Sequence, residues 1–149
     1  MNNIQLQNRT VLITGSAGFI GAALVRALLK KFSPITVVGI DNMNDYYDVS
    51  IKEWRLKKLE EEASARPGSV YRFVKGDIAD RDTVERIFAE YAPDIVVNLA
   101  AQAGVRYSII NPDAYIQSNI IGFYNILEAC RHSGDSGEGV AHLVYASSS

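Results

Sequence analysis

The sequence predicts a doubly wound α/β fold, in which helices cover both faces of a parallel sheet. Strand and helix signals alternate along the whole chain, which is typical of parallel strands joined by right-handed helical crossovers. The expected strands are apolar at successive positions, as in Ile95-Val96-Val97-Asn98-Leu99, and this pattern is expected when both faces of a sheet are buried. A chain of 149 residues is long enough for one packed domain.

Each expected element is bounded by a change in hydrophobic pattern or by a loop signal. The first strand is an apolar run that ends in a glycine-rich turn, and the second ends at an acidic residue. Loop signals at Arg66-Pro67-Gly68-Ser69 and at the glycine-rich run 133–139 separate later elements. The predicted elements are strand 10–14, helix 19–32, strand 35–40, helix 49–65, strand 70–75, helix 81–91, strand 94–99, helix 112–133 and strand 140–146.

The turn after the first strand has the glycine spacing of a dinucleotide site. In such a site one glycine makes the tight turn, one lets the backbone approach a pyrophosphate, and one packs the new helix against the sheet. The N–H groups at the helix N-terminus then face the phosphates. The spacing by itself also fits a plain strand-to-helix turn. The cofactor contacts expected here are Gly15, Ala17, Gly18, Phe19, Ile20 and Gly21.

An acidic residue at the end of the second strand supports the dinucleotide interpretation. Asp41 lies twenty residues after Gly21, where a carboxylate can accept hydrogen bonds from the ribose hydroxyls of an adenosine. Because a carboxylate there would repel a 2′-phosphate, we predict NAD rather than NADP as the cofactor.

Residues after the third and fourth strands are expected to line the same crevice. Asp77 and Ile78 could bind the adenine amino group and cover its ring, although Asp77 or Asp80 could instead cap the following helix. The amide of Asn119 could point at the fourth-strand loop or make a structural hydrogen bond in the core. Small residues after the fourth strand would let a dinucleotide lie close to the backbone. The cofactor contacts expected in this loop are Leu99, Ala100, Ala101 and Gln102.

Composition argues against several other functions. The formal net charge is −2 without a basic stripe, so nucleic acid is not an expected partner, and we interpret the mixed charges of 52–62 as a solvated helix face. The lone Cys130 and only two histidines exclude an internal disulfide and make a metal centre unexpected. The N-terminus lacks the apolar core of a secretory signal, and no run is long enough to span a bilayer, so we expect a cytoplasmic protein.

Taken together, these motifs resemble the extended short-chain dehydrogenase/reductase family of nucleotide-sugar epimerases and dehydratases. The resemblance covers nearly the whole chain, and segments 42–48, 101–108 and 119–123 are similar to those of UDP-glucuronate 4-epimerases. The chain departs from the family at Asn98, where many relatives carry histidine. The motifs that carry the resemblance are the glycine loop, Asp41-Asn42, Gly76-Asp77-Ile78, Leu99-Ala100-Ala101-Gln102-Ala103, Asn119 and the terminal serines.

The resemblance implies a tightly bound NAD and a UDP-sugar substrate that is epimerised through a 4-keto intermediate. Arg106 could read the carboxylate of a uronate bidentately, or it could hold its own loop. Relatives suggest a homodimer built from helices, for which 81–91 and 112–133 are the candidates. The further site residues that the resemblance implies are Asn42 and Ser147 for the cofactor, Ser148 for catalysis, and Arg106, Ser108 and Ser149 for the substrate.

The catalytic base of that family is a tyrosine followed four residues later by a lysine on the same helix. The one matching string, Tyr71 to Lys75, falls on an expected strand, where four residues span about 13 Å instead of about 6 Å on a helix. This pair is therefore not expected to be catalytic. We expect residues 1–149 to be an NAD-binding Rossmann domain that is truncated before the Tyr-x-x-x-Lys helix and the substrate domain, and that is inactive by itself.

Three other functions fit the same cofactor residues. A nucleotide-sugar 4,6-dehydratase or a UDP-glucuronate decarboxylase would share them, and dehydratases carry an acidic pair just after the serine or threonine at the end of the fifth strand. A non-catalytic dinucleotide-binding sensor would require a full-length protein without a Tyr-x-x-x-Lys helix.

Overall fold

The computed structural model describes residues 5–147 and confirms the predicted doubly wound α/β fold. Its described strands form one parallel sheet in the order β3-β2-β1-β4-β5. Consecutive strands on either side of β1 are joined through helices, as the alternation of signals predicts. The strands are β1 (Thr10–Thr14), β2 (Thr36–Asp41), β3 (Val70–Lys75), β4 (Ile95–Asn98) and β5 (His142–Tyr145).

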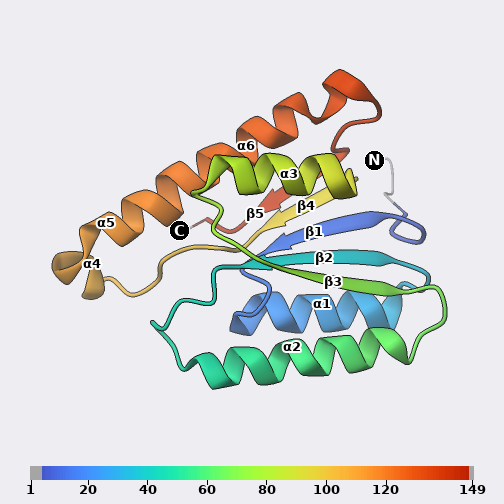
Figure 1. Ribbon diagram of the computed structural model, residues 1–149, viewed down its shortest axis with the longest axis horizontal. Coiled ribbons are helices and arrows are strands. Elements are labelled where there is room, and N and C mark those ends of the chain that lie inside the picture. The colour runs from blue at the N-terminus through green and yellow to red at the C-terminus, as the bar shows by residue number, and fades with distance from the viewer. Residues whose placement is uncertain (1–4, 148–149) are drawn as a thin grey trace.

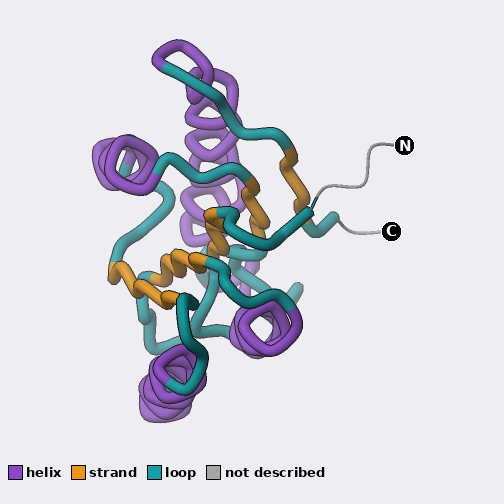
Figure 2. Tube along the Cα trace, turned by 90° about the vertical axis from the view of Figure 1, so that its right-hand side faces the viewer, coloured by secondary structure: helices purple, strands orange, loops and turns teal. Residues whose placement is uncertain are grey.

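Helices cover both faces of this sheet. The first two helices lie on one face, and the third and sixth lie on the other (Figure 1). The view along the sheet in Figure 2 shows the strands between these two helical layers. The helices are α1 (Phe19–Lys31), α2 (Val49–Ser64), α3 (Arg81–Tyr91), α4 (Tyr107–Ile110), α5 (Pro112–Tyr115), the π-helical η1 (Ile116–Gly122), α6 (Phe123–His132) and the 3-10 turn η2 (Ser133–Ser136).

The apolar strand pattern has a direct structural cause. In β1, Val11 and Ile13 pack with α1 in one core cluster, whereas Leu12 belongs to the cluster beneath α3 and α6. Successive side chains of a strand point to opposite faces of a sheet. Because both faces are covered here, every position of the strand must be apolar, which removes the usual alternation.

The sequence of α1 shows how one helix is fixed against the sheet. Its buried residues include Ala22, Val25 and Leu29, a spacing that places them on one side of the helix. Lys30 and Lys31 occupy the last turn, where cations interact favourably with the helix dipole. This packing fixes the N-terminal end of α1 at the edge of the sheet where the glycine-rich loop lies.

The prediction of one continuous helix over 112–133 is wrong, because the structure divides this stretch into α5, η1 and α6. Pro112 begins α5, and the Asn111 side chain accepts a hydrogen bond from the Ala114 N–H at 3.3 Å. The chain then passes through the π-helical η1 before α6 begins at Phe123. The short α4 was also not expected. A pattern of apolar residues locates the buried face of a helix. It does not distinguish α-helical hydrogen bonds, from each N–H to the fourth residue before it, from π-helical ones, to the fifth residue before it.

Candidate functional site

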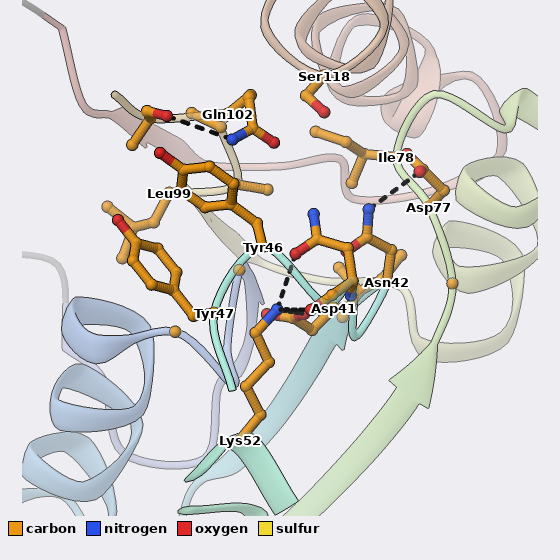
Figure 3. A pocket seen from close by; sticks show the side chains of 18 residues that line it. Asp41, Asn42, Tyr46, Tyr47, Lys52, Asp77, Ile78, Leu99, Gln102 and Ser118 are labelled. Atoms are coloured by element: carbon orange, nitrogen blue, oxygen red, sulfur yellow. Dashed lines mark hydrogen bonds and ion pairs between the residues drawn. The ribbon is translucent and has the colours of Figure 1, made fainter. Parts of the chain in front are cut away.

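A cleft lies at the carboxyl edge of the sheet, beside β1. Strands β2 and β3 lie on one side of β1 and β4 and β5 on the other, so the strand order reverses there. Open α/β sheets bind ligands at such a switch point. Figure 3 shows the side chains around this cleft. The lining residues are Gly15, Gly18, Ile40, Asp41, Asn42, Asn44, Tyr46, Tyr47, Lys52, Gly76, Asp77, Ile78, Leu99, Ala100, Ala101, Gln102, Ala103 and Ser118.

The three glycines of the loop meet three different spatial demands. Gly15 has a φ of +68°, and a Cβ there would lie 3.0 Å from the backbone nitrogen of Ala100. A Cβ on Gly21 would lie 2.1 Å from the Gly15 carbonyl oxygen, so this glycine allows α1 to pack against the loop. Gly18 stands at the N-cap of α1 and lines the cleft. The loop therefore forms a cradle that side chains would fill, as a pyrophosphate site requires.

Asp41 ends β2 beside this loop and is 8% exposed. Its Oδ2 accepts a hydrogen bond from the Ala17 N–H at 3.1 Å, and its Oδ1 accepts one from the Met43 N–H at 2.9 Å. The Nζ of Lys52 lies 3.7 Å from Oδ1. Since a carboxylate has about four acceptor positions, these contacts leave capacity on Oδ2 for a ligand hydroxyl. The carboxylate is thus positioned as a ribose acceptor should be.

The two aspartates after β3 take different positions, and the contact of Asp77 with an adenine stays a prediction. Asp77 lines the cleft, accepts a hydrogen bond from the Asn42 amide at 3.1 Å and one from the Ala79 N–H at 2.8 Å. Asp80 instead stands at the N-cap of α3. The Thr83 hydroxyl donates to Asp80 at 2.6 Å and holds the pKa of that carboxyl below its usual value. Asp80 thus occupies the N-cap position without a capping hydrogen bond from its side chain, whereas Asp77 and Ile78 line the cleft.

Two side chains hold the loop after β4. The Asn119 amide donates to the Gln102 carbonyl at 3.1 Å and accepts from the Gln102 N–H at 2.8 Å, as one alternative from the sequence predicted. The Thr14 hydroxyl accepts from the N–H groups of Leu99 and Ala100 at 3.0 and 2.9 Å. The same hydroxyl donates to the Asn98 side chain at 2.7 Å. Thr14 was not predicted to support this loop, because a threonine within a strand carries no motif of its own.

Several residues expected to contact the cofactor do not line the cleft themselves. Ala17 and Gly21 are buried behind the glycine loop. Phe19 and Ile20 lie in the first turn of α1 and are 79% and 65% exposed. Asn119 acts on the cleft through the backbone of Gln102. Their contacts with a cofactor stay predictions.

The residues expected to bind substrate, together with Ser147 for the cofactor and Ser148 for catalysis, lie outside the cleft lining or outside the described part of the chain. Arg106 is exposed at the N-cap of α4. The Ser108 hydroxyl donates to the Val105 carbonyl at 2.6 Å. Ser147 is exposed after β5, and Ser148 and Ser149 lie outside the described residues. The roles assigned to these five residues stay predictions.

Lys52 was misjudged from the sequence. Instead of lying on a solvated face, it is 5% exposed and lines the cleft from the first turns of α2. Its Nζ donates to the backbone carbonyl of Asn44 at 2.9 Å and to the Asn44 side chain at 3.1 Å. Segment 42–48 brings Asn44 to this ammonium group. A lysine in a run of mixed charges is usually exposed, so the sequence carried no sign of this burial.

A group of tyrosines joins segment 42–48 to the loop after β4. The Tyr46 ring centroid lies 4.7 Å from that of Tyr47 and 4.9 Å from that of Tyr107. The Tyr115 hydroxyl donates to the carbonyls of Ala103, at 3.0 Å, and of Gly104. Tyr46 and Tyr47 also line the cleft (Figure 3). Tyr46 and Tyr47, together with Asn44 and Lys52, form what we call the second wall of the cleft.

The residues that line the cleft can bind a ligand, and the Tyr-x-x-x-Lys string does not lie among them. The string from Tyr71 to Lys75 lies on β3, as predicted, and Tyr71 is buried in the core, which raises its pKa to about 12.

Within residues 5–147, no group of three His, Cys, Asp or Glu side chains is placed to hold a metal ion. No helix in that range is long and apolar enough to cross a membrane.

Comparison with known proteins identifies relatives along nearly the whole chain. A family model described as GDP-mannose 4,6 dehydratase matches residues 12–149. The chain is 48% identical over 139 residues to Protein CapI of Staphylococcus aureus, covering 93% of this chain and 37% of the relative. It is 43% identical over 140 residues to UDP-glucuronate 4-epimerase 4 of Arabidopsis thaliana, covering 94% of this chain and 29% of the relative.

A solved structure shares the same arrangement of elements. The UDP-glucose 4-epimerase of Bifidobacterium longum, in complex with NAD+ and UDP, has a TM-score of 0.71 and 28% identity over 94% of this chain and 37% of that one. The chain therefore spans well under half of the length of each of these three proteins.

Proposed function

The chain belongs to the GDP-mannose 4,6-dehydratase family of NAD-dependent epimerases and dehydratases, and we propose that it is the NAD-binding part of a nucleotide-sugar 4-epimerase. The sugars that we propose are UDP-glucuronate and UDP-galacturonate. The identity of 43% to a UDP-glucuronate 4-epimerase supports this pair. We also propose that the catalytic helix and the substrate domain belong to a longer protein.

One observation carries the cofactor assignment: the Asp41 carboxylate is bonded to the glycine-rich loop through the Ala17 N–H. This contact sets a ribose acceptor and a pyrophosphate cradle side by side. Gly15 and Gly18 would receive the pyrophosphate, and Asp41 the adenosine ribose. Asp77 and Ile78, at the next strand end, would receive the adenine. The solved epimerase that holds NAD+ and UDP supports the same cofactor here.

In the proposed reaction, NAD supplies an acceptor for the hydride on C4 of the sugar and then returns it to the opposite face. The residues of this chain bind and orient. Thr14 and Asn119 fix the loop after β4, so that small residues there meet the cofactor without strain. Ser148, which lies outside the described residues, would hold the sugar hydroxyl. The base that removes its proton would come from a Tyr-x-x-x-Lys helix beyond residue 149.

For the substrate, we propose that Arg106 pairs with the uronate carboxylate. Its position at the start of α4 supports this role, because its exposed side chain follows the cleft-lining segment 99–103 in the chain. A guanidinium and a carboxylate can form two parallel hydrogen bonds. Ser108 and Ser149 are the other proposed substrate contacts. A homodimer through α3 and the helical stretch 112–133 (α5, η1 and α6) and a cytoplasmic location stay predictions from the sequence.

The experiment that tests this function uses the full-length protein with UDP-glucuronate, followed by NMR. Appearance of UDP-galacturonate supports the proposal. A dehydratase is the second candidate, favoured by the description of the matching family model. Because a dehydratase eliminates the 6-hydroxyl, which a uronate lacks, a parallel sample contains GDP-mannose or UDP-glucose, and a 4-keto-6-deoxy product there would indicate a dehydratase. Release of carbon dioxide would indicate a decarboxylase. NAD binding with no turnover of any UDP-sugar would support the alternative function, a non-catalytic dinucleotide-binding sensor.

A further inference from the structure

A buried ammonium group stands beside the carboxylate that is proposed to hold the adenosine ribose. The Nζ of Lys52 lies 3.7 Å from Oδ1 of Asp41, and both side chains are less than a tenth exposed while lining the cleft. Figure 3 shows the two groups together with Asn42 at one end of the cleft. A carboxylate that selects NAD acts through its negative charge, and here that charge is compensated by a neighbour.

The surroundings of Lys52 fix its ammonium in this place. Its hydrogen bonds to Asn44 use the backbone carbonyl and the side-chain oxygen of that residue, and both acceptors are neutral. Asp41 is the only carboxylate among the described residues that forms an ion pair with Lys52. If the Asp41 charge is removed, a buried cation is left without a counter-ion, which is strongly unfavourable until an anion binds.

We propose, building on the proposed NAD site, that Asp41 and Lys52 determine cofactor preference as a pair. Lys52 is a binding group for a 2′-phosphate, and its ion pair with Asp41 keeps this group occupied. In the native protein the ion pair with Asp41 offsets the positive charge of Lys52, so a 2′-phosphate gains little from this ammonium. Once the carboxylate is neutral, Lys52 meets the 2′-phosphate of NADP with a charge-assisted hydrogen bond. Lys52 is therefore a specificity-determining residue, and its effect on NADP depends on the charge at residue 41.

The test measures NAD and NADP binding by calorimetry in the full chain and in three variants: Asp41→Asn, Lys52→Met and the double variant. Asparagine retains an oxygen that can accept the Ala17 N–H. We expect Asp41→Asn to raise NADP affinity about tenfold or more when Lys52 is present. In the Lys52→Met background the same change should give little gain. Lys52→Met alone should weaken NADP more than NAD.

A purely structural role for Lys52 predicts a different outcome. If it only holds segment 42–48, Lys52→Met weakens NAD and NADP by the same factor, and Asp41→Asn acts equally in both backgrounds. That result would overturn the proposal. Lys52→Gln serves as a second variant if the methionine variant does not fold, because its amide can still donate to Asn44 without a charge. Lys58→Met is the matched control, since Lys58 lies exposed on the same helix and pairs with Glu61.

Salt dependence adds an independent readout. Binding of NADP to the Asp41→Asn variant should weaken more steeply with added salt than binding of NAD, and Lys52→Met should abolish that difference. Equal salt dependence for the two cofactors would contradict the proposal. Failure of the unmodified chain to bind NAD would reject the proposed function as well, whereas NAD binding without the expected coupling would reject only the role of Lys52.

Discussion

The Asp41 carboxylate and the Ala17 N–H are joined by a hydrogen bond of 3.1 Å, which holds the end of β2 against the glycine-rich loop. Ala17 is fully buried and Asp41 nearly so. The residue assigned to the ribose thus also supports the loop assigned to the pyrophosphate. Substitutions at Asp41 should therefore change the stability of the chain as well as its affinity for a dinucleotide.

Asp41→Ala should weaken NAD binding much more than NADP binding, because alanine removes the acceptor for the ribose hydroxyls together with the charge that repels a 2′-phosphate. It should also lower the free energy of unfolding by about 3 kcal/mol or more, since the buried Ala17 N–H loses its partner and the buried Lys52 loses its counter-ion. Calorimetry and urea denaturation measure the two effects. Asp45→Ala is the control, because Asp45 is exposed in the same segment. Tighter binding of NADP than NAD by the unmodified chain would contradict the cofactor assignment.

The glycine loop allows binding and folding to be separated. Gly18→Val should abolish NAD binding, because its side chain would occupy the space proposed for the pyrophosphate. The helical circular dichroism should be preserved, since a Cβ at Gly18 meets only the Gly15 carbonyl oxygen, at 3.1 Å. Gly21→Ala should instead destabilise the fold, because its Cβ would lie 2.1 Å from that same oxygen. Thermal unfolding and NAD titration of both variants distinguish these effects. Retained NAD affinity in Gly18→Val would mean that the phosphates bind elsewhere.

Tyr71 should make the fold sensitive to alkaline pH. Burial raises its pKa to about 12 from a model-peptide value of 10.0, so the neutral phenol stabilises the folded state fully below pH 10. This contribution, about 3 kcal/mol, should be lost as the pH rises through 12. Tyr71→Phe should therefore reduce the loss of stability between those values, measured by urea denaturation. Tyr47→Phe, at an exposed tyrosine, should leave the loss unchanged; equal curves for both variants would contradict the assignment.

The layered fold and most of the dinucleotide cleft follow from local patterns in the sequence. The continuous apolar run of β1 and the glycine spacing are short-range signals, and Asp41, Asp77 and the residues 99–102 lie directly at strand ends. A parallel sheet brings all such ends to one edge, so the topology alone places these residues together. The residues at the end of each strand could therefore be predicted to line one cleft from the local pattern of that strand alone.

The second wall of the cleft could not be predicted in the same way. Asn44 and Tyr46 line the cleft because of the path of segment 42–48, and that path depends on contacts with residues far along the chain, such as Tyr107. Lys52 follows on α2, where it is bonded to Asn44. Met43, with a φ of 57°, makes the turn after Asp41 without a glycine to signal it. The interruption of the helix at η1 likewise has no marker in the hydrophobic pattern.

The last prediction concerns the 149-residue chain by itself, which we expect to bind NAD and to turn over no sugar nucleotide. Removal of the hydride from C4 requires a base at the hydroxyl, and a positioned base with a suitable pKa is needed for this step. Tyr71 cannot serve, because it is buried on β3 and its pKa is raised to about 12. A serine such as Ser148 can orient the hydroxyl, but without a partner that lowers its pKa it cannot accept the proton at neutral pH.

NMR of UDP-glucuronate incubated with this chain and NAD is the measurement, and calorimetry on the same sample first establishes that NAD is bound. The full-length protein provides the positive control under identical conditions. Formation of UDP-galacturonate by the 149 residues alone would show that a base lies within them. The tyrosines beside the cleft, which are the half-buried Tyr46 and Tyr107 and the exposed Tyr47, would then be replaced one at a time by phenylalanine, because each has a ring in or next to the lining. Loss of turnover in one of these variants would identify the base.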